Sequence, residues 1–271
     1  MDRELVTDSE EVLRIFTKSR AGKRVFDAWR RRKPHVTERV MEHRTSAVYK
    51  LASSEIRSLT SEHALGRLRP SEGYQVESIR DWRPDFAFSH IFHFHLEERG
   101  RMYSFQEFRE WSRLDRFRPM LHTPAWEEVK KAIGVGYSEQ QAKDSVRWRI
   151  GLAYYSFVRE MYVVARLREL GLDACFHPLA DALFRTDTWI GTTSVSLYIK
   201  NQKFRDGQTG RKPPAEKLLG GEESGLKFIE LGIPTQRLWG EVHFPDEAAV
   251  DACAKRLHQL STQLWKAPGS L

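Results

Sequence analysis

The chain has 271 residues, and 40% of them are hydrophobic, which suffices for a buried core in one large domain or two smaller ones. This composition excludes a disordered chain, and no apolar run approaches the roughly 20 residues that cross a bilayer. The formal charge of +7 and the pI near 9.4 favour acidic partners, with nucleic acid ahead of an anionic membrane surface.

The first 70 residues are predicted to be helical and strongly basic. Between Lys18 and Arg44 there are ten Lys or Arg residues against three acids. Arg30, Arg31, Arg32 and Lys33 form the densest run, and Arg binds phosphate in a forked, charge-assisted geometry. The run therefore predicts contacts to a nucleic-acid backbone. The alternative is a solvated helix end, with Phe26 and Trp29 packed inward and the cations exposed.

Residues 74–98 change character. Tyr74–Ile79 and Phe86–Leu96 are predicted as strands on either side of a turn at 82–85. His93 and His95 would then share one face, which is a workable geometry for two metal ligands, whereas His90 would point the other way. The alternative is that these histidines are buried and hydrogen-bonded. Residues 104–133 are predicted to return to helix, with breaks at two prolines.

A domain boundary is expected at Gly134-Val135-Gly136, between two helical patterns. Residues 1–135 would form a mainly helical, basic region with a short β portion, and residues 136–271 an α/β core. The core would begin with a long helix over 138–170, because apolar residues recur there at spacings of three and four. Glu160 falls on this apolar stripe, where a carboxylate needs a partner.

A β-hairpin is predicted to follow the helix and a strand over 172–177. In its first strand, Asp181, Arg185 and Asp187 lie on one face, opposite Ala182, Phe184 and Ile190. The second strand, 194–200, places Val195, Leu197 and Ile199 opposite the face that carries Tyr198 and Lys200. A turn at 191–193 would bring the two polar faces side by side and make Asp187 and Lys200 neighbours.

The residues after the hairpin are predicted to form a Gly-rich basic loop, two strands and a helix. The loop, 201–221, carries Lys203, Arg205, Arg211 and Lys212, which suit the phosphate backbone of a nucleic acid. The strands are expected at 226–231 and 237–244. The helix would begin after an N-cap at Asp246 and end near Trp265.

The hairpin resembles that of the PD-(D/E)xK nuclease superfamily, the restriction-endonuclease-like fold, over roughly residues 140–265. The order of helix, strands and helix agrees with that layout. The triplet here reads Tyr198-Ile199-Lys200, so Tyr198 stands where the family usually places an acid. The resemblance implies that Asp187 holds Mg²⁺ with Asp181 or Glu160 and the Ile199 carbonyl, and that Lys200 positions the attacking water. Either another acid replaces the missing one, or the chain is a degenerate, non-cutting member.

These patterns together predict a nucleic-acid-acting protein, a Mg²⁺-dependent DNA endonuclease of a defence or mobile-element system. The alternative is a non-catalytic DNA-binding subunit, or a scaffold whose basic surfaces contact an acidic protein partner. An Asp and a Lys on the exposed face of a hairpin also form ordinary cross-strand ion pairs.

The cysteines and the N-terminal segment indicate the cellular compartment. Cys175 and Cys253 lie in predicted core elements without the spacing of metal ligands, and reduced thiols are therefore expected. The first residues, MDRELVTDSEEVLRIF, are acidic and amphipathic, unlike a secretory signal. A cytoplasmic protein without membrane partners is predicted.

Overall fold

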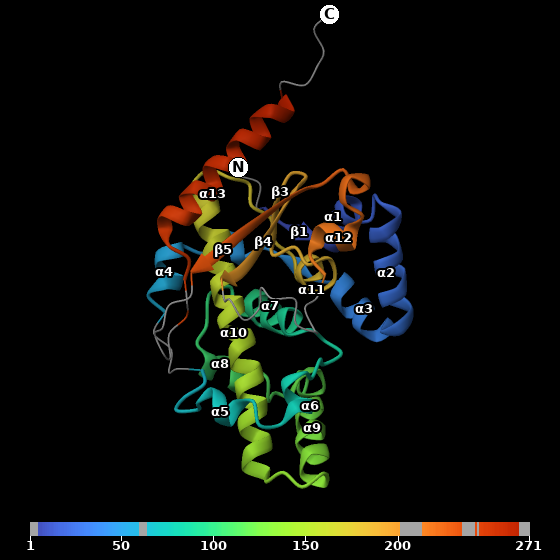
Figure 1. Ribbon diagram of the computed structural model, residues 1–271, viewed down its shortest axis with the longest axis vertical. Helices are drawn as coiled ribbons and strands as arrows, with labels where there is room; N and C mark the ends of the chain where they lie inside the picture. Colours follow the sequence, from blue (N-terminus) through green and yellow to red (C-terminus); the bar gives the residue numbers. More distant parts are fainter. Residues whose placement is uncertain (1–4, 60–63, 201–212, 235–241, 243, 266–271) are drawn as a thin grey trace, which may run out of the picture. The chain divides into compact units, whose positions relative to one another are not determined.

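The computed structural model describes residues 5–59, 64–200, 213–234, 242 and 244–265, with the backbone alone for 199–200, 233–234 and 261–265. The protein is a mixed α/β structure, 62% helical with two small sheets (Figure 1), so the predicted α/β class is confirmed at this level. The chain divides into two compact units. Unit 1 comprises residues 1–57, 159–237 and 243–271, and unit 2 comprises residues 58–158 and 238–242.

Unit 1 contains both sheets and the terminal helices. Its elements in chain order are β1 (Thr7–Asp8), α1 (Ser9–Phe16), α2 (Arg20–Arg32), α3 (Pro34–Met41), β2 (Arg44–Thr45), η1 (Ala47–Lys50), α4 (Ser53–Arg57), α11 (Pro178–Phe184), β3 (Thr188–Ile190), β4 (Thr193–Lys200), α12 (Ala215–Leu219), η4 (Gly221–Ser224), β5 (Lys227–Pro234) and α13 (Glu247–Trp265). The long helix α10 (Glu139–Glu169) ends in this unit.

The larger sheet has the order β3-β4-β5. β3 and β4 form an antiparallel hairpin in which Thr188 lies opposite Val195, joined through Gly191 in the left-handed conformation (φ 56°). β5 runs parallel to β4, and Cys175 forms a single antiparallel bridge to Trp189 on the other side of β3. The hairpin and the helix over 138–170 are therefore confirmed. The strand over 172–177 is reduced to that one bridge.

The core of unit 1 follows from the alternation of residues along the strands. Val195 on β4 and its register partner Ile229 on β5 are buried, as is Leu231. Trp189 is 1% exposed and meets the ring of Phe16 edge-on at 5.5 Å. Phe184 stacks on Phe16 at 5.4 Å, so α1, α11 and the hairpin share one aromatic cluster.

The prediction that residues 181–190 form one strand was wrong. Residues 178–184 are the helix α11, which Pro178 begins at a position where proline is favoured and His177 caps. Arg185 ends the helix in the left-handed conformation, and only three residues remain for β3. Asp181 is therefore a helix residue. β5 at 227–234 and α13 confirm the later predictions, whereas most of the strand expected at 237–244 lies outside the described residues.

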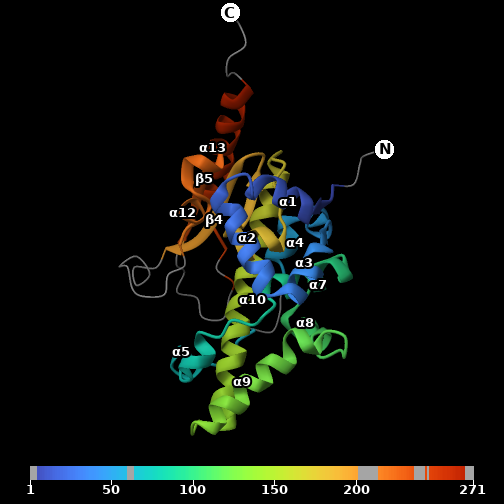
Figure 2. The ribbon, with the colours of Figure 1, turned by 90° about the vertical axis from the view of Figure 1, so that its right-hand side faces the viewer.

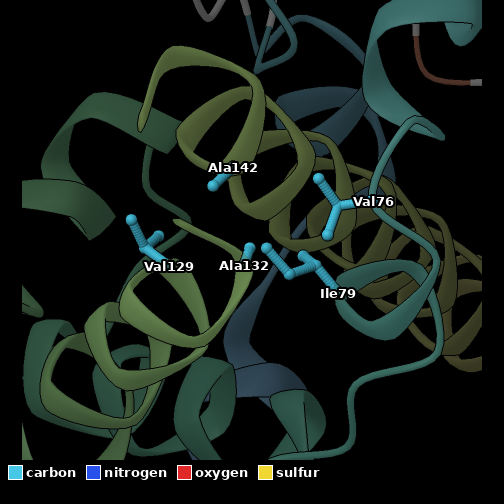
Figure 3. Packing of buried hydrophobic residues seen from close by; sticks show 5 residues of the cluster. All are labelled: Val76, Ile79, Val129, Ala132 and Ala142. Atoms are coloured by element: carbon cyan, nitrogen blue, oxygen red, sulfur yellow. The ribbon is translucent and has the colours of Figure 1, made fainter. Parts of the chain in front are cut away.

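Unit 2 is built from helices in the part that the structure describes. Its elements are α5 (Pro70–Gly73), α6 (Glu77–Arg80), α7 (Phe88–Arg99), α8 (Phe105–Trp111), η2 (Arg118–Met120), α9 (His122–Gly134) and α10 as far as Val158. α9 runs beside the N-terminal part of α10 (Figures 1 and 2). Between α6, α9 and α10, a small cluster of buried side chains, Val76, Ile79, Val129, Ala132 and Ala142, closes the packing (Figure 3).

The strands predicted at 74–79 and 86–96 were wrong, because both stretches contain helices. His90, His93 and His95 lie on α7 and are at most 2% exposed. The histidines are thus buried like their aromatic neighbours, and their alternation in the sequence does not mark an exposed and a buried face. The ring of His95 lies 4.1 Å from that of Tyr103, and burial lowers its pKa to about 4. Among the described residues no group of three metal-ligating side chains occurs, and the histidines belong to an aromatic core.

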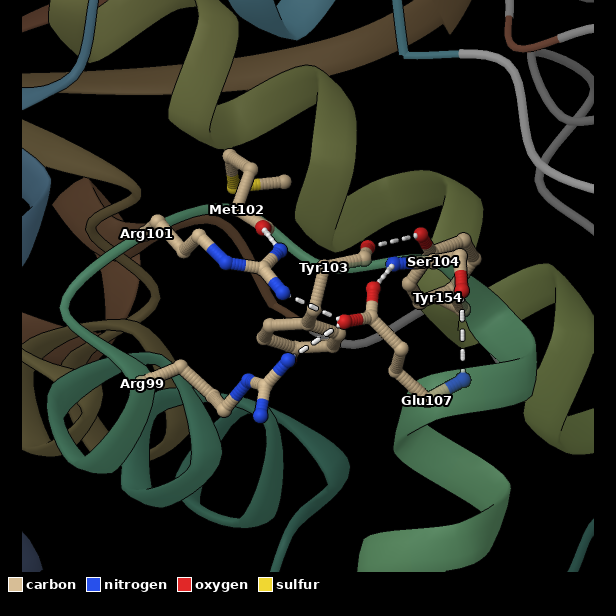
Figure 4. Close-up of polar contacts among 7 residues, drawn as sticks. All are labelled: Arg99, Arg101, Met102, Tyr103, Ser104, Glu107 and Tyr154. Atoms are coloured by element: carbon tan, nitrogen blue, oxygen red, sulfur yellow. Dashed lines mark hydrogen bonds and ion pairs between the residues drawn. The ribbon is translucent and has the colours of Figure 1, made fainter.

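A network of charges fixes the start of α8 (Figure 4). Ser104 and Glu107 form a capping box, and Arg99 and Arg101 both donate to Glu107, at 2.5 and 2.6 Å. Partial burial favours a raised pKa for Glu107, but these donors outweigh it and lower the pKa to about 2. The same segment carries Tyr103, whose backbone carbonyl accepts from Tyr154 at 2.6 Å.

Two further expectations concern the chain as a whole. Across the described residues, no helix has both the length and the apolar character that a membrane span requires, and both cysteines are free. The division into 1–135 and 136–271 stays a prediction. The Gly134–Gly136 segment lies inside unit 2, where it joins α9 to α10.

Candidate active site

Two carboxyl groups meet beside the hairpin of unit 1. Asp181 lies on α11 and Asp187 directly precedes β3, and their side chains are hydrogen-bonded to each other. Two ionised carboxylates repel each other, so this contact is favourable only when one of the two groups carries a proton. Burial, together with the charge of Asp181, raises the pKa of Asp187 well above its usual value.

The position of Asp187 is set by the backbone of β4. Its N–H donates to the Val195 carbonyl at 3.1 Å, and its carboxyl group accepts from the Leu197 N–H at 2.5 Å. Arg159 on α10, only 7% exposed, interacts electrostatically with Asp187 and lowers its pKa against the larger effect of burial. The acidic pair is thus held by a strand and faces a buried cation.

The pair opens onto a pocket of about 320 Å³ that lies wholly in unit 1. Besides the pair, its lining includes Arg185, Ser196, Tyr198, Glu216 and Glu230. Glu230 on β5 is the register partner of Ser196, so parallel pairing of β4 and β5 delivers a third acid to this side of the sheet. We refer to this site, lined by four carboxyl groups and one guanidinium, as the acidic pocket.

Arg185 has an unusual backbone at the edge of the acidic pocket. It is the one non-glycine residue with a positive φ in the described chain, at φ 61° and ψ 31°. Such a conformation costs about 1–3 kcal/mol for most residues, and residues that adopt it are enriched at functional sites. Its carbonyl accepts a hydrogen bond from the Ser196 hydroxyl at 3.0 Å, which ties the end of α11 to β4.

His177 holds the other end of α11 and thereby positions Asp181. Its Nδ1 accepts from the Leu179 N–H at 3.1 Å, so Nε2 carries the proton and donates to the His43 carbonyl at 3.2 Å. The side chain is fully buried, and burial lowers its pKa to about 4. Protonation at Nδ1 would break the cap and leave a charge inside unit 1.

We expect unit 1 to lose stability in mild acid through His177. Because the pKa of this imidazole is lower in the folded protein than the usual 6.5, its contribution is complete above pH 6.5 and is lost as the pH falls through about 4. Urea unfolding followed by circular dichroism at pH 7.5, 5.5 and 4.5 measures this loss. A His177→Asn variant retains an acceptor for the Leu179 N–H and should show a flatter dependence; an equal slope in both proteins would contradict this role.

The other two predicted catalytic residues, Glu160 and Lys200, come from α10 and from the end of β4. Glu160 follows Arg159 on α10 and interacts with it electrostatically, but the described lining of the acidic pocket does not include Glu160. On β4, Asp187 meets the stretch 195–197, and the backbone of Lys200 pairs with Pro234 of β5. Lys200 is therefore four residues beyond Ser196, and the backbones of these two residues are roughly 13 Å apart along the strand. The ladder does not make Asp187 and Lys200 neighbours, which corrects that expectation.

The predicted nucleic-acid contacts fall in two places. Arg30, Arg31 and Arg32 are exposed in the last turn of α2, and Lys33 is half-buried at the junction with α3. Phe26 and Trp29 on the same helix are buried, at 9% exposure each. Lys203, Arg205, Arg211 and Lys212 lie outside the described residues.

The donor set of the acidic pocket fits a hard cation in one respect. Mg²⁺ is commonly held by one or two carboxylates, with water and substrate phosphates completing its octahedron. Asp181 and Asp187 supply that number, and a cation would take the place of the proton that they share. No closed cage is present, since the described residues contain no group of three or more metal-ligating side chains close enough to bind one ion.

No protein-family model, curated protein or solved structure matches this chain. Sequence reasoning missed Arg159, Glu216 and Glu230, which join the pair or the acidic pocket from α10, α12 and β5. The parallel pairing of β4 with β5 is the signal that locates Glu230, and the pattern of the hairpin alone does not contain it.

Proposed function

We propose that this chain acts on nucleic acid as a Mg²⁺-dependent DNA endonuclease of a defence or mobile-element system, with a restriction-endonuclease-like core. The observation that carries this proposal is the hydrogen-bonded pair Asp181–Asp187 at the start of a β-hairpin, inside a pocket. The order of α10, hairpin, α12, β5 and α13 supports the fold assignment. The basic end of α2 suits a phosphate backbone.

The roles follow from the chemistry of each group. Asp187 and Asp181 would hold the cation, which when bound activates a water molecule and stabilises charge on a phosphoryl oxygen. Arg159 offsets the charge of the pair and so lowers the free-energy cost of burying two acids.

A second function is favoured by Tyr198. This residue occupies the position of the usual acid and lines the acidic pocket. The raised pKa of Asp187 means that a cation must compete with a proton for this carboxyl group. These observations support a non-catalytic DNA-binding subunit, or a scaffold for a protein partner, that keeps the core without cutting.

Cleavage of DNA by the full chain separates these functions. Supercoiled plasmid, linear duplex and single-stranded RNA are incubated with Mg²⁺, with Ca²⁺ and with EDTA between pH 6 and 9. If the chain is an endonuclease, it should nick DNA only with Mg²⁺. The rate of nicking should rise with pH, because the carboxyl pair must lose its proton before a cation binds. Salt-dependent binding of DNA without cleavage under any of these conditions would establish the non-catalytic subunit instead, and failure to bind DNA would leave the scaffold.

A further inference from the structure

Unit 2 contains a second, larger pocket that shares no residue with the acidic pocket. Its volume is about 710 Å³, within the range of small-molecule sites. α8, α9 and the first half of α10 supply an apolar floor, formed by Phe105, Phe108, Leu121, Val129, Val146 and Ile150. We refer to it as the cationic pocket, for the charges at its rim.

Five cations and one carboxylate line the cationic pocket. The cations are Arg109, Arg113, Arg118, Lys143 and Arg147, and the carboxylate is Asp144. Arg118 lies 3.6 Å from Asp115, whose side chain is fully exposed, and Lys143 pairs with Glu139 at 2.5 Å on the helix surface. Surface pairs of this kind are weak, so a ligand anion can compete for both cations.

The positive potential reaches into the pocket. His122, at the start of α9, also lines it. Burial lowers the pKa of His122, and Arg118 and Arg113 lower it further. An anion in the pocket would therefore gain from guanidinium groups that already act on a neighbouring side chain.

Aromatic side chains offer a surface for a ring. Trp126 on α9 is 40% exposed, and the Lys143 ammonium lies 5.4 Å from the centre of its ring. Phe105 and Phe108 form part of the floor. A planar ring can stack on the exposed Trp126, and the several negative charges of a nucleotide match five cations better than the single carboxylate of a fatty acid does.

We propose that the cationic pocket binds a free nucleotide, with its base against the aromatic and apolar side and its phosphates at Arg113 and Arg118. The pocket lies wholly within unit 2, so nucleotide binding there does not depend on the proposed function of the carboxyl pair in unit 1. Its volume suits one nucleotide, and its charge suits two or three phosphates.

Titration of the full chain with fluorescent ATP and AMP analogues, in EDTA, tests this site. We expect saturable binding at micromolar concentrations, tighter for the triphosphate and weaker at high salt. Arg113→Ala combined with Arg118→Ala should weaken it at least tenfold. Both residues are exposed, so the fold should persist, as circular dichroism would verify. Trp126→Ala should weaken it about fivefold or more, in line with the loss of one stacked ring.

Lys130→Ala is the matched control. Lys130 lies on α9, is 52% exposed, pairs with Glu127 at 2.6 Å and is not among the lining residues, so its loss should leave the affinity unchanged. Several results would overturn the nucleotide site: no binding at millimolar nucleotide, equal affinity in the double variant and the parent, or binding of palmitate or of a single-stranded oligonucleotide where free nucleotides fail.

Discussion

Replacing Asp187 with Asn should abolish Mg²⁺-dependent DNA cleavage while leaving thermal stability equal or higher. An amide cannot ligate Mg²⁺ as a carboxylate does, and we expect activity to fall at least a hundredfold. The carbonyl oxygen of the introduced amide can still accept from the Leu197 N–H, and its NH₂ group can donate to Asp181 without a shared proton. The burial that raises the pKa of Asp187, and to a smaller extent the charge of Asp181, would then act on a neutral side chain.

The pH dependence of stability provides a second measurement of the same change. A carboxyl group whose pKa is raised on folding contributes stability at low pH, and that stability is lost as the pH rises through the folded pKa. The Asp187→Asn variant should lack this loss, so its advantage in melting temperature should grow with pH. Differential scanning calorimetry between pH 5 and 9 follows the effect without any assay of activity.

Asp173→Asn provides the matched control for this variant. Asp173 is an exposed acid of unit 1 outside the acidic pocket, so the same chemical change should alter neither cleavage nor stability. If Asp187→Asn cleaved like the parent, the nuclease assignment would be removed. If it lost stability and activity in proportion, Asp187 would be a structural partner of its neighbours.

Helical spacing and strand alternation were sufficient to predict α10, β4 and α13. α10 and α13 repeat apolar residues at three and four, and β4 alternates a buried Val195 with polar neighbours. The prediction for α7 failed because histidines alternate there with aromatic residues, as polar and apolar residues do in a strand, although both kinds are buried. A pattern that is apolar all round has no period from which to tell helix from strand.

The acidic pair was predicted in part, and for an incomplete reason. Asp181 and Asp187 were placed on one strand face, but Asp181 reaches the pair from a helix that a proline begins and that ends at a strained Arg185. Three residues, Arg159, Glu216 and Glu230, come from elements distant in sequence, and their arrival depends on tertiary packing. Local patterns do not encode such contacts.

Replacing Arg30, Arg31, Arg32 and Lys33 with Ala should reduce the salt dependence of DNA binding. Each lost phosphate contact lowers the log–log slope by about 0.9, so four contacts would lower it by nearly four units, with a large loss of affinity at low salt. The fold should survive. Arg30 pairs with Asp27 at a distance of 3.8 Å, Arg32 bonds the Ala28 carbonyl of its own helix, and cations in a last turn contribute about 0.3–1 kcal/mol.

Fluorescence anisotropy with a labelled duplex between 50 and 300 mM salt measures that slope. Lys130→Ala with Lys131→Ala is the control for general charge, because these exposed lysines of α9 pair with Glu127 and Glu128 in unit 2. The control should keep the parent slope within one unit. An unchanged slope in the fourfold variant would mean that these cations are a solvated helix end, stabilising α2 through its dipole while Phe26 and Trp29 pack inward.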